Sequence, residues 1–289
     1  MEFTPIRLTE KTQHAAAWAL TPCHSIDYTL INLFGWQKYF DLSWGQEKTL
    51  LWIRQSPDLF WAPLGDWEAA DWDLELSLLP SPLELIRVPE ALVTILTERI
   101  PERIQVKETR GQWEYLYAKT DLATLAGRNF HKKKNLCNSF VKAYGEPDYR
   151  PISDNIVEDV LALEDEWCQW HECEGSKSLQ AENTAINLVL SHWSDFSGLL
   201  GGALYIDDRI AAFSIGEPLD ATSIGVHYEK GLLGFKGIYQ TINREFAIHC
   251  PDTVQILNRA QDLDEEGLRA AKTSYNPCGY LKKYAVTIQ

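Results

Sequence analysis

The sequence predicts an α+β protein of two domains, each with a mixed, mostly antiparallel sheet flanked by helices. Three observations support this. The chain has 289 residues, which is long for one compact core. Hydrophobic residues make up 45% and charged residues 24%, as in ordinary folded proteins. The same order of helical and strand-like patterns also occurs twice, so we place one domain at residues 1–120 and the other at 121–289.

The second half shows the pattern most clearly. Apolar residues at Ile156, Val160, Leu163 and Trp167 recur at helical spacing after Asp154, a predicted N-cap. A second helix is predicted over 179–193. The segments that follow predict a hairpin of 203–206 with 210–215, a strand at 223–228 and a glycine-spaced loop at 231–237. After the loop they predict a helix at 238–246, a strand at 254–257, a helix at 267–274 and a strand at 280–288.

The first half repeats this order more faintly. Its predicted elements are a hairpin of 39–44 with 49–54, a strand at 59–63, a helix from Trp67, a strand at 83–88, a helix at 90–99 and strands at 104–109 and 114–118. The loop that matches 231–237 is only 63–66, with one glycine and no basic residue. We therefore expect the first domain to be a degenerate copy that shapes the substrate site and binds no cofactor.

The order of elements in each half resembles the GNAT acyltransferase fold. In that fold, the loop after the third strand of the meander leads into a helix N-terminus. Backbone amides and the helix dipole make such a place suitable for a phosphate. Gly234, Lys236 and Gly237 are the candidates in this loop.

Charge restricts the partners. The net charge is −14, with −6 in residues 1–120 and −8 in residues 121–289. Extended nucleic-acid binding is therefore disfavoured, and an anionic partner requires a local basic patch.

The six cysteines contain no CxxC pair, and the spacing of Cys168, His171 and Cys173 fits no common zinc pattern. We predict no metal site.

The N-terminus has no signal-peptide pattern, and no 18-residue apolar run predicts a transmembrane segment. We expect a cytoplasmic protein with reduced thiols.

The strongest candidate for a basic patch is the run around residue 130. Arg128, His131, Lys132, Lys133 and Lys134 place four fixed positive charges and a histidine within seven residues. On a helix, Arg128, Lys132 and Asn135 share one face. The run can hold the phosphates of a donor; the alternative is a solvated charged face.

Two further groups are candidates for chemistry. Glu229 and Lys230 end the third strand of the meander, where Glu229 can act as a general base and Lys230 can bind an anion. A surface ion pair is the alternative.

Tyr275 can protonate a leaving group, because a tyrosine is protonated at neutral pH. The alternative is a packed tyrosine. Arg259 and Lys272 are further candidates for binding an anionic donor, and Glu182, Asn258 and Asp262 are other candidates near the same cleft.

Together these segments resemble the DUF2156 family, which is related to the C-terminal domain of phosphatidylglycerol lysyltransferases and, more distantly, to the FemABX peptidyltransferases. The resemblance covers nearly the whole chain. It rests on Asp27, Tyr28, 32–36, 63–65, 115–117, Leu122, Leu125, 127–135, Trp167, Glu182, Phe213, Gly216, Glu217, 227–230, Asn258, Arg259, Asp262, 267–272, Ser274, Tyr275 and Pro277.

The resemblance implies a tandem GNAT-like fold of bacterial type and transfer of an aminoacyl group from aminoacyl-tRNA to an amine or hydroxyl of a lipid headgroup or peptide. The lysyltransferases are attached to membrane-spanning segments, whereas this sequence predicts none, so a lipid would be met peripherally. The loop Gly231-x-x-Gly234-x-x-Gly237 also differs from the Gln/Arg-x-x-Gly-x-Gly/Ala of acetyl-CoA enzymes. The alternatives are a CoA-dependent N-acyltransferase, with acyl-CoA as the donor, and a non-catalytic ligand-binding module.

Overall fold

The computed structural model describes all residues from 1 to 289, in two compact units. The first unit comprises Met1–Glu114, Gln261–Glu266 and Tyr280–Gln289, and the second comprises Tyr115–Ala260 and Gly267–Gly279. This division differs from the expected boundaries of 1–120 and 121–289, because two C-terminal segments belong to the first unit.

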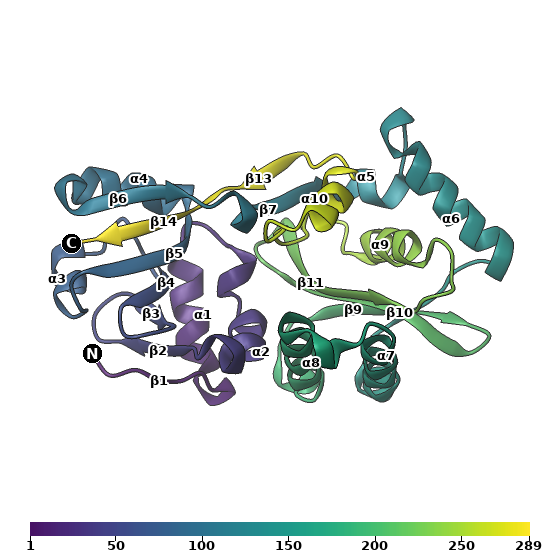
Figure 1. Cartoon of the computed structure of the whole chain (residues 1–289), viewed down its shortest axis with the longest axis horizontal. Helices are drawn as coiled ribbons and strands as arrows, with labels where there is room; N and C mark the ends of the chain where they lie inside the picture. The colour runs from purple at the N-terminus through teal and green to yellow at the C-terminus, as the bar shows by residue number, and fades with distance from the viewer. The chain divides into compact units, whose positions relative to one another are not determined.

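The first unit is a seven-stranded sheet with helices (Figure 1). The strands, in spatial order, are β1 (Thr4–Pro5), β2 (Ser43–Gln46), β3 (Leu51–Arg54), β4 (Leu59–Leu64), β5 (Leu83–Pro89), β14 (Lys283–Ile288) and β6 (Ile104–Glu108). The helices are α1 (Lys11–Leu20), α2 (Leu30–Phe40), α3 (Trp72–Ser77) and α4 (Glu90–Arg99). Only the pairing of β4 with β5 is parallel. Four tryptophans, Trp44, Trp52, Trp61 and Trp67, are fully buried in its core.

Most of the second seven-stranded sheet lies in the second unit. Its strands, in spatial order, are β8 (Asp148–Pro151), β9 (Leu200–Ile206), β10 (Arg209–Pro218), β11 (Ser223–Gly231), β12 (Ile256–Asn258), β7 (Glu114–Ala118) and β13 (Gly279–Leu281). The helices are α5 (Lys119–Thr124), α6 (His131–Tyr144), α7 (Val157–Trp170), α8 (Lys177–Leu190), α9 (Ile238–His249) and α10 (Glu266–Thr273). In Figure 1, α7 and α8 cover one face of this sheet and α9 covers the other.

The two sheets have the same plan, including an exchanged strand at the same position. Strand β7 ends the first series of elements along the chain but lies in the second sheet, between β12 and β13. Strand β14 ends the second series but lies in the first sheet, between β5 and β6. The strand expected at 280–288 is therefore two strands, and most of it completes the first sheet. Period-two patterning identifies a strand but not its partner, which is why the sequence does not reveal the exchange.

Most expected elements are present, with changes at their ends. Helix α7 buries Val160, Leu163 and Trp167, as predicted, and Ser176 caps α8 by accepting from the Leu179 amide. The predicted cap Asp154 makes no cap hydrogen bond and lies in a 3-10 turn before α7. Helix α3 begins after Asp71 and not at Trp67, because Asp71 caps it. The expected strand at 39–44 begins only at Ser43, since Tyr39 still belongs to α2.

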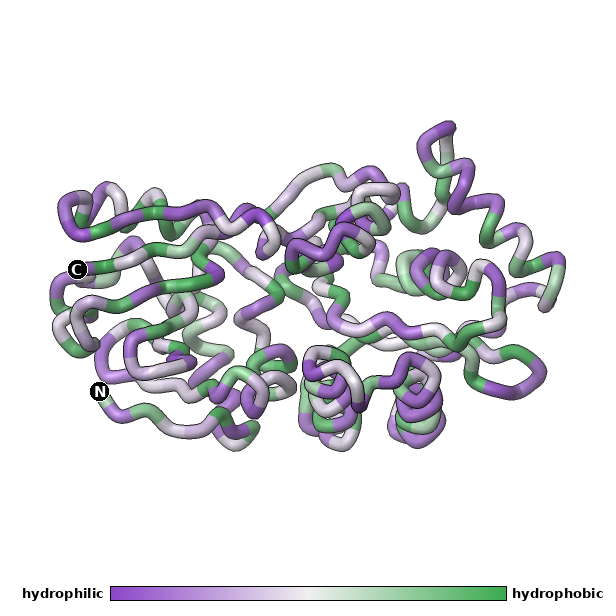
Figure 2. Tube along the Cα trace, in the orientation of Figure 1, coloured by the Kyte–Doolittle hydropathy of each residue, from purple (hydrophilic) through white to green (hydrophobic).

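Hydropathy follows the fold. Figure 2 shows hydrophobic residues along the central strands of each unit, whereas α6 is mainly hydrophilic. Phe140 of α6 packs with Ile238 and Ile242 of α9, so this basic helix is fixed to the second unit by a narrow apolar contact.

None of the helices combines the length and the apolar character that crossing a lipid bilayer requires.

Candidate functional site

The candidate site lies in the second unit, where two parallel strands separate. Strands β11 and β12 pair over three positions only, the last joining Gly225 to Asn258. Strand β11 continues to Gly231 without a partner on this side, while the chain leaves β12 at Arg259. Side chains from both strands can therefore meet across the opening.

Glu229 and Arg259 bridge this opening. Arg259 Nη2 donates to Glu229 Oε1 at 2.8 Å, and Asn243 Nδ2 of α9 donates to Glu229 Oε2 at 3.2 Å. Both members of the ion pair are largely buried. Such partly desolvated, charge-assisted bonds fix the direction of a guanidinium. Glu229 thus holds Arg259 in one orientation, in addition to any role as a base.

Two cations lie close to the Tyr275 ring. Lys133 Nζ is 4.1 Å and the Arg259 guanidinium carbon 5.0 Å from the centre of its ring. Burial is the main cause that raises the pKa of Tyr275 above its ordinary value, and the side chain of Gln240 hydrogen-bonds its hydroxyl. The phenol therefore stays protonated at neutral pH. Burial, followed by the charge of Arg259, lowers the pKa of Lys133.

Lys272 adds a third cation. Its Nζ donates to the backbone carbonyl of Arg259, and Tyr117 Oη donates to the carbonyl of Lys272 at 2.8 Å. We call Lys133, Arg259, Lys272, Glu229 and Tyr275 the cation cluster. Three positive charges face one carboxylate, so the cluster favours an anion although the protein is acidic overall.

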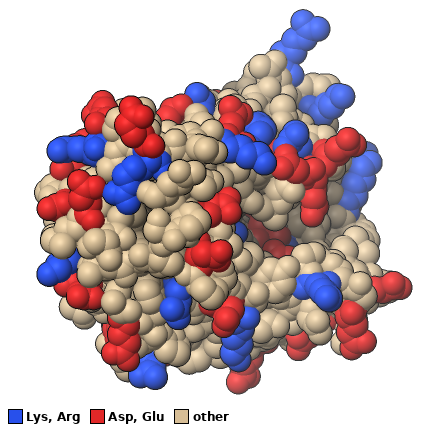
Figure 3. Space-filling view, turned by 60° about the vertical axis from the view of Figure 1, so that its left-hand side comes forward, with Lys and Arg blue, Asp and Glu red and all other residues tan.

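Helix α6 extends this positive charge outward. Lys132 and Lys134 are exposed, whereas Lys133 points inward to Tyr275. His131 is exposed and its Nε2 lies 3.1 Å from Asn135 Nδ2. Arg128 is exposed in the 3-10 turn before the helix. No acidic residue occurs in α6, whereas Figure 3 shows basic and acidic side chains interspersed over the face in view.

Lys230 and Glu182 lie elsewhere, on the opposite face of the sheet. Consecutive strand residues point to opposite faces, so Lys230 points to α7 and α8. Its Nζ donates to Glu182 Oε2 at 2.7 Å and lies 3.5 Å from the centre of the Trp167 ring. The structure therefore does not bring Lys230 and Glu182 together with the cation cluster.

The glycine loop precedes α9, as expected. Gly234 and Gly237 have φ values of +93° and +86°, which favour glycine. Lys236 is exposed. A Cβ on Gly237 would lie 2.3 Å from the Leu136 carbonyl oxygen of α6, so this oxygen occupies part of the space before α9.

Two other candidates have structural contacts. Asn258 is buried, and its Oδ1 accepts from the Ala260 amide at 3.1 Å. Asp262 belongs to the first unit, where it accepts from Arg110 Nη1 at 3.1 Å and from the Asp264 amide at 2.9 Å. Neither side chain is directed to the cation cluster by these bonds.

Sequence reasoning missed Gln240 and Asn243, which contact Tyr275 and Glu229. They are three residues apart on a predicted helix, and this spacing predicts that their side chains lie on the same face of the helix. It also missed Glu164 of α7, a fully buried carboxylate.

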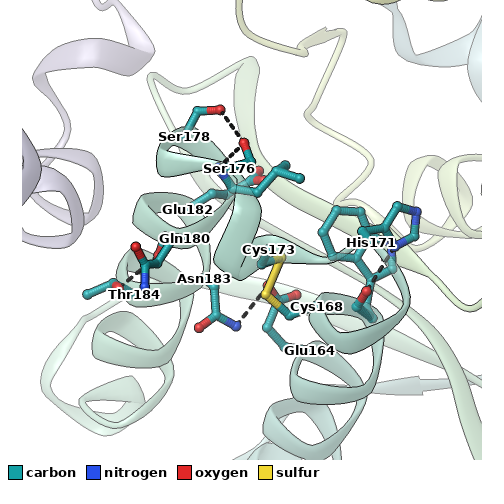
Figure 4. The surroundings of a disulfide bond; sticks show 12 residues. Glu164, Cys168, His171, Cys173, Ser176, Ser178, Gln180, Glu182, Asn183 and Thr184 are labelled. Carbon is teal, nitrogen blue, oxygen red and sulfur yellow. Dashed lines mark hydrogen bonds between the residues drawn. A yellow bond between two sulfur atoms is a disulfide. The ribbon is translucent and has the colours of Figure 1, made fainter.

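The expectation of reduced thiols is wrong for Cys168 and Cys173, which form a disulfide with Cα atoms 5.2 Å apart (Figure 4). The chain turns back after α7 through Glu172, a left-handed residue, and this brings the two together. The other four cysteines are free.

Known proteins are similar to this chain in sequence and in fold. Residues 19–287 match the family described as phosphatidylglycerol lysyltransferase, C-terminal. An uncharacterized protein of Mycoplasmoides gallisepticum is 28% identical over 176 residues, which are 60% of this chain and 56% of that protein. The aligned part thus spans little more than half the length of that relative.

Solved structures show the same architecture. A conserved protein of unknown function from Bacteroides thetaiotaomicron has a TM-score of 0.88 at 28% identity, with both chains fully covered. The C-terminal DUF2156 domain of a proposed lysylphosphatidylglycerol synthetase from Agrobacterium fabrum has a TM-score of 0.66 at 12% identity, covering 97% of this chain and 92% of that one. A GNAT-family acetyltransferase from Colwellia psychrerythraea has a TM-score of 0.50 at 9% identity, covering 100% and 99%.

The fold is therefore the tandem GNAT-like, acyltransferase-like α+β fold that the sequence predicts, and the chain belongs to the phosphatidylglycerol lysyltransferase C-terminal (DUF2156) family.

Proposed function

We propose that this protein transfers an aminoacyl group from aminoacyl-tRNA to an amine or hydroxyl acceptor on a lipid headgroup or peptide. The observation that carries the proposal is the cation cluster at the opening between β11 and β12, continued outward by the acid-free helix α6. Family membership supports this class of reaction, since a phosphatidylglycerol lysyltransferase moves a lysyl group.

The donor would be held through its phosphates. Arg128, Lys132 and Lys134 are exposed together at the start of α6 and can each contact a phosphate. The patch is small, so it suits the terminal part of a tRNA better than an extended duplex.

In the proposed step, the acceptor nitrogen or oxygen attacks the ester carbonyl of the donor. A carbon–nitrogen or carbon–oxygen bond forms, and the bond from the carbonyl carbon to the ribose oxygen breaks. Tyr275 gives its proton to the leaving ribose oxygen, and Glu229 takes the proton that the nucleophile loses. Arg259, held by Glu229, stabilises the negative charge on the carbonyl oxygen. An activated ester needs little beyond such positioning.

Donor binding can be tested with a charge-matched pair of variants. Lys132→Ala/Lys134→Ala should weaken aminoacyl-tRNA binding in a filter assay and lower the slope of log K against log salt by about 1.5, because two phosphate contacts are lost. Lys38→Ala/Lys48→Ala removes two lysines of the first unit and should bind as the wild type does. Equal losses in both variants would contradict the proposed donor surface.

Transfer can be tested separately with a labelled aminoacyl group. Tyr275→Phe keeps the buried ring but removes the proton donor, so transfer should fall by about 10²-fold or more while tRNA binding is unchanged. Unchanged transfer would show that Tyr275 is a packed tyrosine only.

Coenzyme A is a second candidate donor, because α9 follows a glycine loop after β11. The Leu136 oxygen beside Gly237 disfavours a phosphate there, since like partial charges repel. Calorimetry with acetyl-CoA separates the two donors: heat of binding that Lys132→Ala/Lys134→Ala leaves intact would favour coenzyme A.

A further inference from the structure

A pocket of about 520 Å³ lies at the β1 edge of the first sheet, beside the end of α2 (Figure 1). It is built entirely from residues of the first unit and shares none with the cation cluster. Two cations, Lys38 and Arg54, line it together with a single carboxylate, Asp41. Sites for small organic molecules have this size. In a chain of net charge −14, an excess of positive charge in one pocket favours an anionic ligand.

Arg54, the last residue of β3, is held in one orientation by two contacts. Its Nε donates to Ser43 Oγ of β2 at 3.2 Å, and its guanidinium carbon lies 4.4 Å from the centre of the Phe3 ring. No carboxylate pairs with it, and its Nη1 and Nη2 groups have no hydrogen-bond partner in the protein. These two groups form the fork through which a guanidinium binds an oxyanion by two parallel hydrogen bonds.

Gln55 adds a donor whose direction is set by the core. Trp61 is fully buried, and its Nε1 donates to Gln55 Oε1 at 2.8 Å. An indole N–H can only donate, so the amide oxygen of Gln55 must face Trp61 and the amide nitrogen is turned away from it. Gln55 lines the pocket, and its Nε2 has no partner in the protein. A second oriented donor group is therefore available beside Arg54.

The remaining lining residues are suited to the rest of such a ligand. Lys38 is exposed in the last turn of α2 and forms no ion pair, so it adds a positive charge at the rim. The apolar residues of the lining are Phe3, Pro5, Leu42 and Pro57. Oriented donors next to apolar surface are typical of sites that bind small organic molecules.

We infer that this pocket binds a small organic oxyanion, a carboxylate or a phosphate monoester that carries an apolar body. The oxyanion accepts hydrogen bonds from the Arg54 fork and from Gln55 Nε2, with Lys38 nearby, and the apolar body contacts the apolar lining residues. The site goes beyond the proposed function, because it uses none of the residues assigned to aminoacyl transfer. It also gives the first unit, which the sequence predicts to bind no cofactor, a ligand of its own.

The test measures binding of three matched probes to the purified protein by saturation-transfer NMR at about pH 7.5. Benzoate and phenyl phosphate carry the two oxyanions, and benzamide has the same ring without a charge. We expect at least one anion to bind about tenfold or more tightly than benzamide. Arg54→Gln should weaken anion binding about tenfold or more, because the charge-assisted pair of hydrogen bonds is lost. Lys48→Ala, which removes an exposed lysine of the same unit outside the pocket, should leave it unchanged.

Two further readouts do not depend on the fold of Arg54→Gln. Lys38→Ala, at an exposed position, should weaken anion binding about two- to fivefold. Added salt should weaken binding of the anions and leave that of benzamide unchanged. Binding of benzoate alone would identify a carboxylate site, binding of phenyl phosphate alone a phosphate site, and binding of both a site for either oxyanion. Benzamide binding as tight as that of both anions, no anion binding at about 10 mM, or an unchanged affinity in folded Arg54→Gln would overturn the inference.

Discussion

Buried ionisable side chains occur in both units, with different surroundings. Lys283 is fully buried but contacts both Asp27 and Glu114. Glu164 is fully buried with one oxygen unpaired. A buried charge that is not fully compensated by partners loses solvation free energy. Such a residue lowers the stability of the protein unless it is protonated or binds a ligand.

We therefore expect Glu164→Gln to stabilise the protein in a pH-dependent way. The pKa of Glu164 is about 7 in the folded protein against an ordinary value of 4.5, so the native state holds the extra proton between these values. Stability then falls as pH rises from about 4.5 to about 7 and stays lower above. The glutamine variant lacks this loss. Urea unfolding should show it more stable by up to about 3 kcal/mol near pH 8 and nearly equal to wild type near pH 4.5. An equal difference at both pH values would contradict the assignment.

At the scale of elements, the loop between β11 and α9 depends on two glycines of different kinds. Both have positive φ, but only Gly237 is in close contact, with the Leu136 carbonyl of α6. A Cβ on Gly234 would enter open space, with no packed atom within 4 Å. Gly237 thus determines how closely α6 approaches α9, and with it the position of Lys133.

Alanine at each glycine separates backbone strain from this contact. Gly234→Ala should cost about 1 kcal/mol of unfolding free energy, from the left-handed conformation alone. Gly237→Ala should cost clearly more, about 3 kcal/mol, because α6 must also shift. The measurement is chemical denaturation of both variants. Equal costs would mean that α6 moves away freely.

Part of the site was within reach of sequence reasoning. Lys133 shares a helix face with Cys137 and Phe140, both buried, so its inward direction follows from spacing. Strand alternation likewise separates Glu229 from Lys230. The ion pair between Arg259 and Glu229 could not be predicted from the sequence, because it depends on where the parallel strands β11 and β12 separate. The pairing of β14 with β5 and β6 also depends on tertiary contacts that no local pattern encodes.

At the scale of the whole molecule, the exchanged strands begin at a buried ionic group. Glu114 is the first residue of β7 and Lys283 the first residue of β14, and their side chains pair within the first unit. Asp27 also contacts Lys283 and is paired with Arg87. Burial by itself would raise the pKa of Asp27. The positive charges of Arg87 and Lys283 together outweigh burial and lower the pKa below its ordinary value, so Asp27 stays ionised.

Removing the central cation should therefore destabilise the protein strongly. Lys283→Met leaves Asp27 and Glu114 as buried carboxylates with less compensation, and we expect a loss of about 3–5 kcal/mol. Lys282→Met is the matched control: Lys282 forms an exposed pair with Glu90 and should cost less than about 1 kcal/mol. Thermal and urea unfolding of both variants provide the comparison. Similar small losses would show that the buried group contributes little.

The reciprocal strand exchange makes the chain resemble an interlocked dimer whose two subunits have been fused. Separately expressed fragments 1–120 and 121–289 would each lack the strand that the other carries, β14 in one case and β7 in the other. Each fragment alone should aggregate through an open sheet edge, whereas co-expression should give a soluble one-to-one complex by light scattering. A fragment that stayed monomeric and folded alone would contradict this. Because each half supplies a strand to the sheet of the other, neither half could have been lost or replaced independently after they were joined.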